Sequence, residues 1–340
     1  MAQPLCPLSN DLTERVPLEI RELVINQLVG DEETLRSCML VCRAWWKASQ
    51  RAIVDASSRL LTKDFGQEVN CAAVIDEMGV ILYGTATGIY ASDLANLGRP
   101  PVQVLNYPNI EQIDSLDKGS IIVFRSGTNV VYGIPFVYLS AKPAGAAAGP
   151  ESCLRIYMRV TTFSVGMVNG SEILCLLRGK ELHMFRRPAS YSLRFLKAVE
   201  PLNKPSCIQI VKGKVMSMSD CDFELFDPQS LGGLGFVEGA QMIAIQPIEE
   251  GFLICYDKFA VCVRETGERL GDILLRWLYP PDRVVFQGHY ILAFSHDHLE
   301  IRHVRTGELL RLIEKHFRLL STTTSKTIVV QDDGSIYQFN

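Results

Sequence analysis

The stretch Val80-Ile-Leu-Tyr-Gly-Thr-Ala-Thr-Gly-Ile-Tyr-Ala-Ser-Asp93 decides the fold. A nearly continuous apolar run is followed by a tight turn and then by a second run in which apolar and polar residues alternate. This pattern predicts a buried strand paired with a partner strand. It returns six more times along the chain, at residues 121–131, 173–185, 215–226, 252–263, 290–303 and 327–339.

The seven hairpins are spaced by roughly 37 to 52 residues. A period near 40 with two to four strands per unit is typical of a β-propeller. We therefore predict a mainly β protein, a seven-bladed β-propeller over residues 58–340. The last hairpin ends at the C-terminus, so the missing outer strand of that blade could come from residues 58–65. Those residues could equally extend the helical segment that precedes them.

Residues 12–57 show helical periodicity and are predicted to form a small all-α unit, after a disordered stretch at 1–11. Pro17 suits a first helical turn, and Ile20, Leu23, Val24 and Leu28 share one apolar face. A second apolar segment, residues 34–45, has apolar residues on more than one side, which implies burial against another surface. That surface could be the propeller itself or another protein.

This segment resembles an F-box over roughly residues 14–50, although Val16 stands where the family usually has Leu. The resemblance implies a three-helix unit that binds a Skp-type adaptor and, through it, a cullin. The residues then placed at the adaptor are Pro17, Leu18, Ile20, Leu23, Val24, Leu28 and Leu35. Those expected to hold the helices together are Val41, Arg43 and Trp45.

A second resemblance covers the propeller. Gly251-Phe-Leu-Ile-Cys-Tyr-Asp-Lys-Phe-Ala-Val-Cys-Val263 is similar to a segment of the citron homology (CNH) domain, as are residues 81–90 and 291–309. The resemblance implies a propeller that binds proteins, small GTPases among them. Residues 141–152, rich in Gly, Ala and Pro, are predicted to be a flexible insertion loop.

The composition predicts an intracellular protein without a nucleic-acid or membrane partner. The net charge is −4, and acidic and basic residues are interspersed rather than clustered. There is no signal peptide pattern and no apolar run long enough for a membrane span. The ten cysteines form no Cys-x-x-Cys pair and mostly lie in apolar runs, which favours free thiols in a reducing compartment. We expect a cytoplasmic and/or nuclear location.

No catalytic, cofactor or metal site is predicted. His296-Asp-His298 has two ligand-type side chains, but the spacing fixes no third ligand beside them, and a polar turn is the favoured interpretation. Residues 232–239 are glycine-rich, yet they lack the spacing of a phosphate-binding loop and are predicted to form a turn between blades. The dispersed carboxylates are expected to face solvent.

These observations lead to a main functional hypothesis and an alternative. The main hypothesis is a non-catalytic substrate-receptor subunit of a cullin-type (SCF) ubiquitin ligase, in which the helical unit binds the adaptor and the propeller binds a target protein. The alternative is a ligase-independent scaffold or effector that acts through the propeller in a Rho-type small-GTPase pathway. Binding of an adaptor through Pro17, Ile20 and Leu28 would discriminate the two.

Overall fold

The computed structural model describes residues 58–339 apart from gaps at 63–64, 98, 117, 141–146, 169, 187–192, 212, 220–222, 227–230, 235–239, 249–250, 265–267 and 323–326. The predicted disordered stretch 1–11 and the predicted F-box unit 12–57 lie outside the described residues.

The described strands form seven four-stranded sheets, which we call blades. Blade 1 contains β2 (Val69–Ile75), β3 (Val80–Thr85), β4 (Gly88–Asp93) and β5 (Val102–Asn106). Blade 2 contains β6 (Ile110–Leu116), β7 (Ile121–Ser126), β8 (Val130–Pro135) and β9 (Leu154–Met158). Blade 3 contains β10 (Thr162–Val168), β11 (Ser171–Arg178), β12 (Glu181–Arg186) and β13 (Arg194–Val199).

The second half of the chain repeats this order. Blade 4 contains β14 (Cys207–Val211), β15 (Lys214–Met218), β16 (Phe223–Phe226) and β17 (Leu231–Leu234). Blade 5 contains β18 (Met242–Ile248), β19 (Gly251–Tyr256), β20 (Phe259–Val263) and β21 (Arg269–Arg276). Blade 6 contains β22 (Arg283–Gln287), β23 (Tyr290–Phe294), β24 (Leu299–His303) and β25 (Leu309–Ile313). Blade 7 contains β26 (Phe317–Thr322), β27 (Thr327–Gln331), β28 (Ile336–Phe339) and β1 (Ser58–Thr62).

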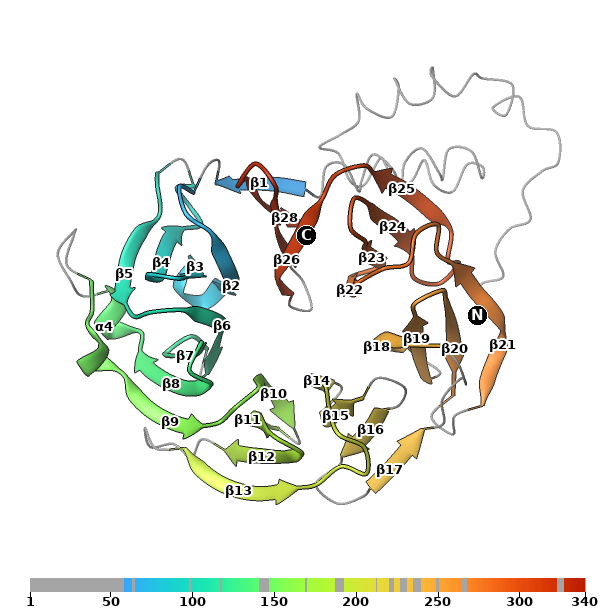
Figure 1. Cartoon of the computed structure of the whole chain (residues 1–340), viewed down its shortest axis with the longest axis horizontal. Helices are drawn as coiled ribbons and strands as arrows, with labels where there is room; N and C mark the ends of the chain where they lie inside the picture. Colours follow the sequence, from blue (N-terminus) through green and yellow to red (C-terminus); the bar gives the residue numbers. More distant parts are fainter. Residues whose placement is uncertain are drawn as a thin grey trace.

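The blades surround a central axis in chain order, with the first strand of blades 1–6 innermost and the fourth outermost (Figure 1). This confirms the predicted mainly β, propeller architecture. The predicted hairpins are the second and third strands of the blades. The second strand is the most deeply buried because both of its faces are covered by neighbouring blades: all six residues of β19, for example, are buried.

The N-terminal strand closes the ring. β1 pairs antiparallel with β28, so the outer strand of blade 7 comes from the opposite end of the described chain. Leu61 of β1 packs in an apolar cluster with residues of blades 1 and 7, including Ile81 and Ile336. Arg318 of blade 7 donates a hydrogen bond of 2.6 Å from Nη2 to the carbonyl oxygen of Val69 in blade 1. Of the two alternatives left open for residues 58–65, the structure shows the closing strand, over residues 58–62, and this pairing covers the edge of β28 that would otherwise be free.

Part of the predicted insertion loop packs against blade 1. Residues 141–146 lie outside the described residues, but Ala148 is fully buried and forms a parallel bridge with Leu105 of β5. Its N–H donates to Val104 and its carbonyl accepts from Asn106, both at 2.8 Å. A small side chain allows this close approach, so the expectation that this segment buries nothing is wrong at Ala148. The helical elements among the described residues are α4 (Val137–Ser140) and 3-10 helices at Asp76–Met78 and Pro150–Ser152.

The glycine-rich stretch is likewise not a turn throughout. Gly232 and Gly233 lie inside β17 and pair with Leu225 and Glu224 of β16. The described helices include none that is long and apolar enough to cross a membrane.

Candidate interaction site

The chain direction within each blade determines which connections share an end of the ring. Neighbouring strands of a blade run antiparallel, so the turns between its second and third strands lie at the same end as the connections between blades. We call this end the top face, and the opposite end the bottom face. Loops held at the end of a rigid sheet are where binding residues concentrate.

Blade 6 contains an almost fully buried ion pair. Glu300 and Arg302, both in β24, are 1% and 7% exposed, and Nε of Arg302 lies 2.8 Å from Oε2 of Glu300. Arg302 also donates to the carbonyl oxygens of Gly307 at 2.9 Å and Arg276 at 3.1 Å. Buried charges are tolerated when they are paired and hydrogen-bonded in this way. The expectation that the carboxylates face solvent is therefore wrong for Glu300.

The second carboxylate oxygen of Glu300 holds the connection between blades 5 and 6. Oε1 accepts the backbone N–H of Leu278 at 2.7 Å and that of Tyr279 at 3.0 Å. One residue earlier, the indole N–H of Trp277 donates to the carbonyl of Tyr256 at 2.8 Å. Because both ends of this short segment are tied to buried groups, its backbone is fixed on the top face.

Two apolar side chains of this segment remain exposed. Leu278 is 56% and Tyr279 is 40% exposed. The Tyr279 ring stacks on the imidazole of His298, with 3.8 Å between ring centroids and 9° between planes. A tyrosine held in one orientation loses little conformational entropy when a partner covers it. We call Leu278, Tyr279 and His298 the Tyr279 site.

Blade 4 has a similar arrangement, in which a buried glutamate accepts a single backbone N–H of the preceding blade connection. Glu224, the second residue of β16 as Glu300 is the second residue of β24, is buried and accepts the backbone N–H of Asn203 at 3.2 Å. Leu202, the residue before Asn203, is 90% exposed. In both blades a buried carboxylate thus fixes the preceding blade connection where an apolar side chain faces solvent.

The histidines near the Tyr279 site do not assemble a metal centre. The structure brings His316, from the connection into blade 7, to a ring-centroid distance of 5.6 Å from His296, a neighbour that sequence spacing could not reveal. Nδ1 of His316 contacts a carboxylate oxygen of Asp332 at 2.5 Å. Within the described part of the chain, no group of His, Cys, Asp and Glu side chains could hold a metal ion.

The described cysteines are free, and several are buried. Burial raises the pKa of the Cys71 and Cys175 thiols to about 12, and it also raises the pKa of Cys255. Thiols with a raised pKa are poor nucleophiles, so these side chains act as small apolar core residues.

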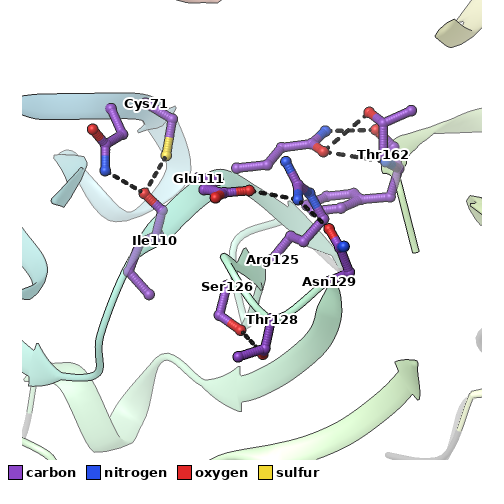
Figure 2. Close-up of polar contacts among 11 residues, drawn as sticks. Cys71, Ile110, Glu111, Arg125, Ser126, Thr128, Asn129 and Thr162 are labelled. Atoms are coloured by element: carbon purple, nitrogen blue, oxygen red, sulfur yellow. Dashed lines mark hydrogen bonds and ion pairs between the residues drawn. The ribbon is translucent and has the colours of Figure 1, made fainter. Parts of the chain in front are cut away.

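Blades 1, 2 and 3 lie across the ring from the Tyr279 site (Figure 1), and polar contacts join them (Figure 2). Cys71 of blade 1 donates to the carbonyl of Ile110 in blade 2. Within blade 2, Arg125 pairs with Glu111 and donates to Asn129. The Cys71 contact links blade 1 to blade 2, whereas the Arg125 contacts tie β7 to β6 and to the following turn within blade 2.

Sequence reasoning missed Leu278 and Tyr279, and the residues that it selected are not described. The predicted adaptor-binding and F-box core residues lie outside the described residues; they are Pro17, Leu18, Ile20, Leu23, Val24, Leu28, Leu35, Val41, Arg43 and Trp45. The available signal for the Tyr279 site was the pair of opposite charges two residues apart on an apolar strand, Glu300 and Arg302.

Comparison with known proteins extends these observations. The family model of the CNH domain matches residues 78–322. Three curated relatives are Rho1 guanine nucleotide exchange factor 1 of Schizosaccharomyces pombe (29% identical), RHO1 GDP-GTP exchange protein 2 of Saccharomyces cerevisiae (24%) and Rho1 guanine nucleotide exchange factor 2 of Schizosaccharomyces pombe (25%). The alignments cover 79%, 84% and 73% of this chain but only 23%, 25% and 24% of the relatives. The chain thus spans about a quarter of their length.

Two solved structures share the fold. The structure described as the AfRom2 CNH domain superposes with a TM-score of 0.71 at 20% identity, covering 83% of this chain and 99% of that one. The WD40 β-propeller domain of Doa1 gives a TM-score of 0.59 at 13% identity, covering 84% and 95%. At these identities the likeness concerns the fold alone.

The relatives correct the main functional hypothesis. They are named for nucleotide exchange on Rho1, which contradicts the predicted substrate receptor of a ubiquitin ligase. The prediction of a non-catalytic protein is contradicted as well, because these relatives are named as exchange factors. The alternative hypothesis, a role in Rho-type GTPase signalling, agrees better with these findings.

Proposed function

The chain belongs to the CNH domain family, and on this premise we propose that it acts in Rho-type GTPase signalling, with its propeller as the part that binds the GTPase. The observation that carries the proposal is the similarity of most of the chain to three Rho1 exchange proteins from two yeasts. We propose the cell interior as the place of action, which the free, buried thiols of the propeller support.

The geometry of the top face supports a protein ligand. Leu278 and Tyr279 offer an apolar anchor, and the carboxylate of Glu300 fixes their backbone before any partner arrives. Exposed aromatic residues on a rigid frame are typical hot spots of protein interfaces. We therefore propose that the GTPase contacts the Tyr279 site.

Binding to a purified Rho-type GTPase tests the proposal. The chain is immobilised, and the GTPase is titrated in its GDP-bound, GTP-analogue-bound and nucleotide-free forms, with a Ras-type GTPase as the specificity control. Saturable binding of the Rho-type protein is expected in at least one form. Equal binding of both GTPases, or no binding in any form, would overturn the proposal.

Because the relatives are exchange factors, release of a fluorescent GDP analogue from the same GTPase is followed in parallel. Acceleration by the chain would show that it carries exchange activity itself. An unchanged rate together with saturable binding would limit its role to recruitment or regulation of the GTPase.

A further inference from the structure

The top face of blade 3 carries a basic pocket separate from the Tyr279 site. It has a volume of about 650 Å³ and is lined by Arg159, Arg178, Gly179, Lys180, Glu181 and Glu200. Residues 178–181 form the turn from β11 to β12, Arg159 follows β9, and Glu200 follows β13. The pocket is thus built from one blade and its two connections. Its lining residues other than Arg178 are exposed, so it is an open depression on the surface.

Arg159 has a backbone conformation that the surrounding structure enforces. Its φ angle is 59°, in the left-handed region that costs a residue with a side chain about 1–3 kcal/mol. The two residues after it are tied down, since Val160 donates to the carbonyl of Asn129 and Thr161 to that of Leu177, both at 2.8 Å. The arginine is therefore placed at the pocket by an imposed turn and not by its own preference.

The same connection is anchored to blade 2 by a side chain. The hydroxyl of Thr162 donates to Oε1 of Gln112 at 3.1 Å, and Nε2 of Gln112 donates to the carbonyl of Phe163. Thr162 and Asn129 lie at the two sides of this junction in Figure 2. The start of blade 3 is thus held against blade 2 directly beside Arg159.

The charges of the pocket favour an anion. Nε2 of His183 contacts the Glu181 carboxylate at 2.8 Å, so one of the two acidic groups is already engaged by a ring that Tyr157 contacts from the other side. No ion pair of Arg159, Arg178 or Lys180 occurs within the described ranges of the chain. Three cations thus line the pocket although the net charge of the protein is −4. The pocket can therefore attract an anion locally despite the overall negative charge.

We propose that this pocket binds carboxylate side chains of an acidic segment in a partner protein. Two observations favour a peptide over a phosphate group. The carboxylates of Glu181 and Glu200 on the same rim would repel a dianion more than a single carboxylate. Met158, next to Arg159, is 51% exposed and offers contact to an apolar residue beside the acidic one. Arginine and lysine supply the charge-assisted hydrogen bonds. Peptide binding at this pocket does not require a GTPase at the Tyr279 site.

Fluorescence anisotropy with a short labelled peptide rich in Glu and Leu tests the proposal, with the peptide carrying Gln in place of every Glu as the ligand control. The double variant Arg159→Ser/Lys180→Ser removes two pocket cations. The matched control, Arg155→Ser/Arg194→Ser, removes two exposed cations of the outer strands β9 and β13 that do not line the pocket. Circular dichroism and thermal melting confirm that both variants are folded.

We expect the pocket variant to bind the Glu-containing peptide at least tenfold more weakly than the parent, and the control variant to match the parent. Equal loss in both variants would overturn the proposal, because it would indicate general electrostatic attraction. Equal binding of the Gln peptide would overturn it too. Vesicles containing phosphatidylserine form the last arm: binding to them that the pocket variant loses, without peptide binding, would assign the pocket to a membrane surface instead.

Discussion

The carboxylate of Glu300 accepts the backbone N–H of Tyr279 at 3.0 Å, across 21 positions of the chain. The same carboxylate pairs with Arg302, and both charges are buried. One side chain therefore joins the interior of blade 6 to the exposed loop of the Tyr279 site. Substitutions of Glu300 should therefore act mainly on the stability of the propeller, whereas substitutions of Tyr279 should act mainly on binding.

Replacing Glu300 with Ala should destabilise the propeller by about 3–5 kcal/mol, because Arg302 would be left as a buried and unpaired charge. The free energy of unfolding, measured by urea denaturation, checks this value. The matched control is Glu268→Ala, which breaks the pair of Glu268 with Arg264; their side chains are 71% and 59% exposed. That change should cost at most about 1 kcal/mol. Similar losses for the two variants would contradict the role given to burial.

Tyr279→Ala should weaken GTPase binding at least tenfold, about 1.4 kcal/mol, with little change in melting temperature. The side chain of Tyr279 is 40% exposed, so its removal should cost little core packing. The backbone N–H of residue 279 can still donate to Glu300 in the variant. Tyr138→Ala is the control: this tyrosine is 52% exposed but lies on α4, in a connection of the bottom face. Unchanged affinity of the Tyr279 variant would remove the site from the interface.

The hairpins of the propeller could be predicted because their signal is local. Each second strand is a short apolar run, and each third strand follows within one turn. The outer strands are different. β13 is largely exposed and β17 contains two adjacent glycines, so neither shows the hydrophobic pattern that identifies a strand. Ala148 was assigned to a mobile loop for a related reason, since its partner, Leu105, is distant in the sequence.

The Tyr279 site could not be predicted because its decisive bonds cross between a strand and the preceding blade connection. The alternation of apolar and polar residues in β24 correctly indicated a strand, and it predicted that Glu300 faces solvent. In the structure, residues of the preceding blade connection, Leu278 and Tyr279, cover the carboxylate of Glu300. The repeat of hairpins at a period near 40 residues indicated the propeller, and the resemblance to the CNH domain implied that small GTPases are among its partners. The wrong functional hypothesis rested on the F-box resemblance of residues 14–50, which lie outside the described residues.

Leu61→Ala tests the closure of the ring. Leu61 is 2% exposed in an apolar cluster shared by blades 1 and 7, so the cavity left by its truncation should cost about 2–5 kcal/mol. Because β1 completes blade 7, urea unfolding should shift as one transition for the whole propeller. The adjacent Leu60, 46% exposed, provides the control, and Leu60→Ala should cost well under half as much. A separate early transition in the Leu61 variant would show that blade 7 opens without the rest.

Asp114 of β6 should make the propeller less stable as pH rises toward neutrality. The pKa of this carboxyl is raised to about 7, mainly by burial and to a smaller extent by the charge of Glu172, against the opposing effect of the hydrogen bond from the N–H of Ser115. The folded state therefore holds the proton more tightly than the unfolded state, whose carboxyl titrates near 3.9. The stabilising contribution is full below about pH 4 and is lost as the pH passes through 7.

Asp114→Asn should remove this dependence while keeping a side-chain oxygen for Ser115. At pH 8 the variant should be more stable than the parent by up to roughly 4 kcal/mol, since each unit of pKa shift corresponds to about 1.36 kcal/mol. At pH 4 the two proteins should unfold at similar urea concentrations, which is the internal control for any loss of packing. Parallel stability profiles of parent and variant from pH 4 to 8 would show that Asp114 keeps its charge in the folded propeller at no cost.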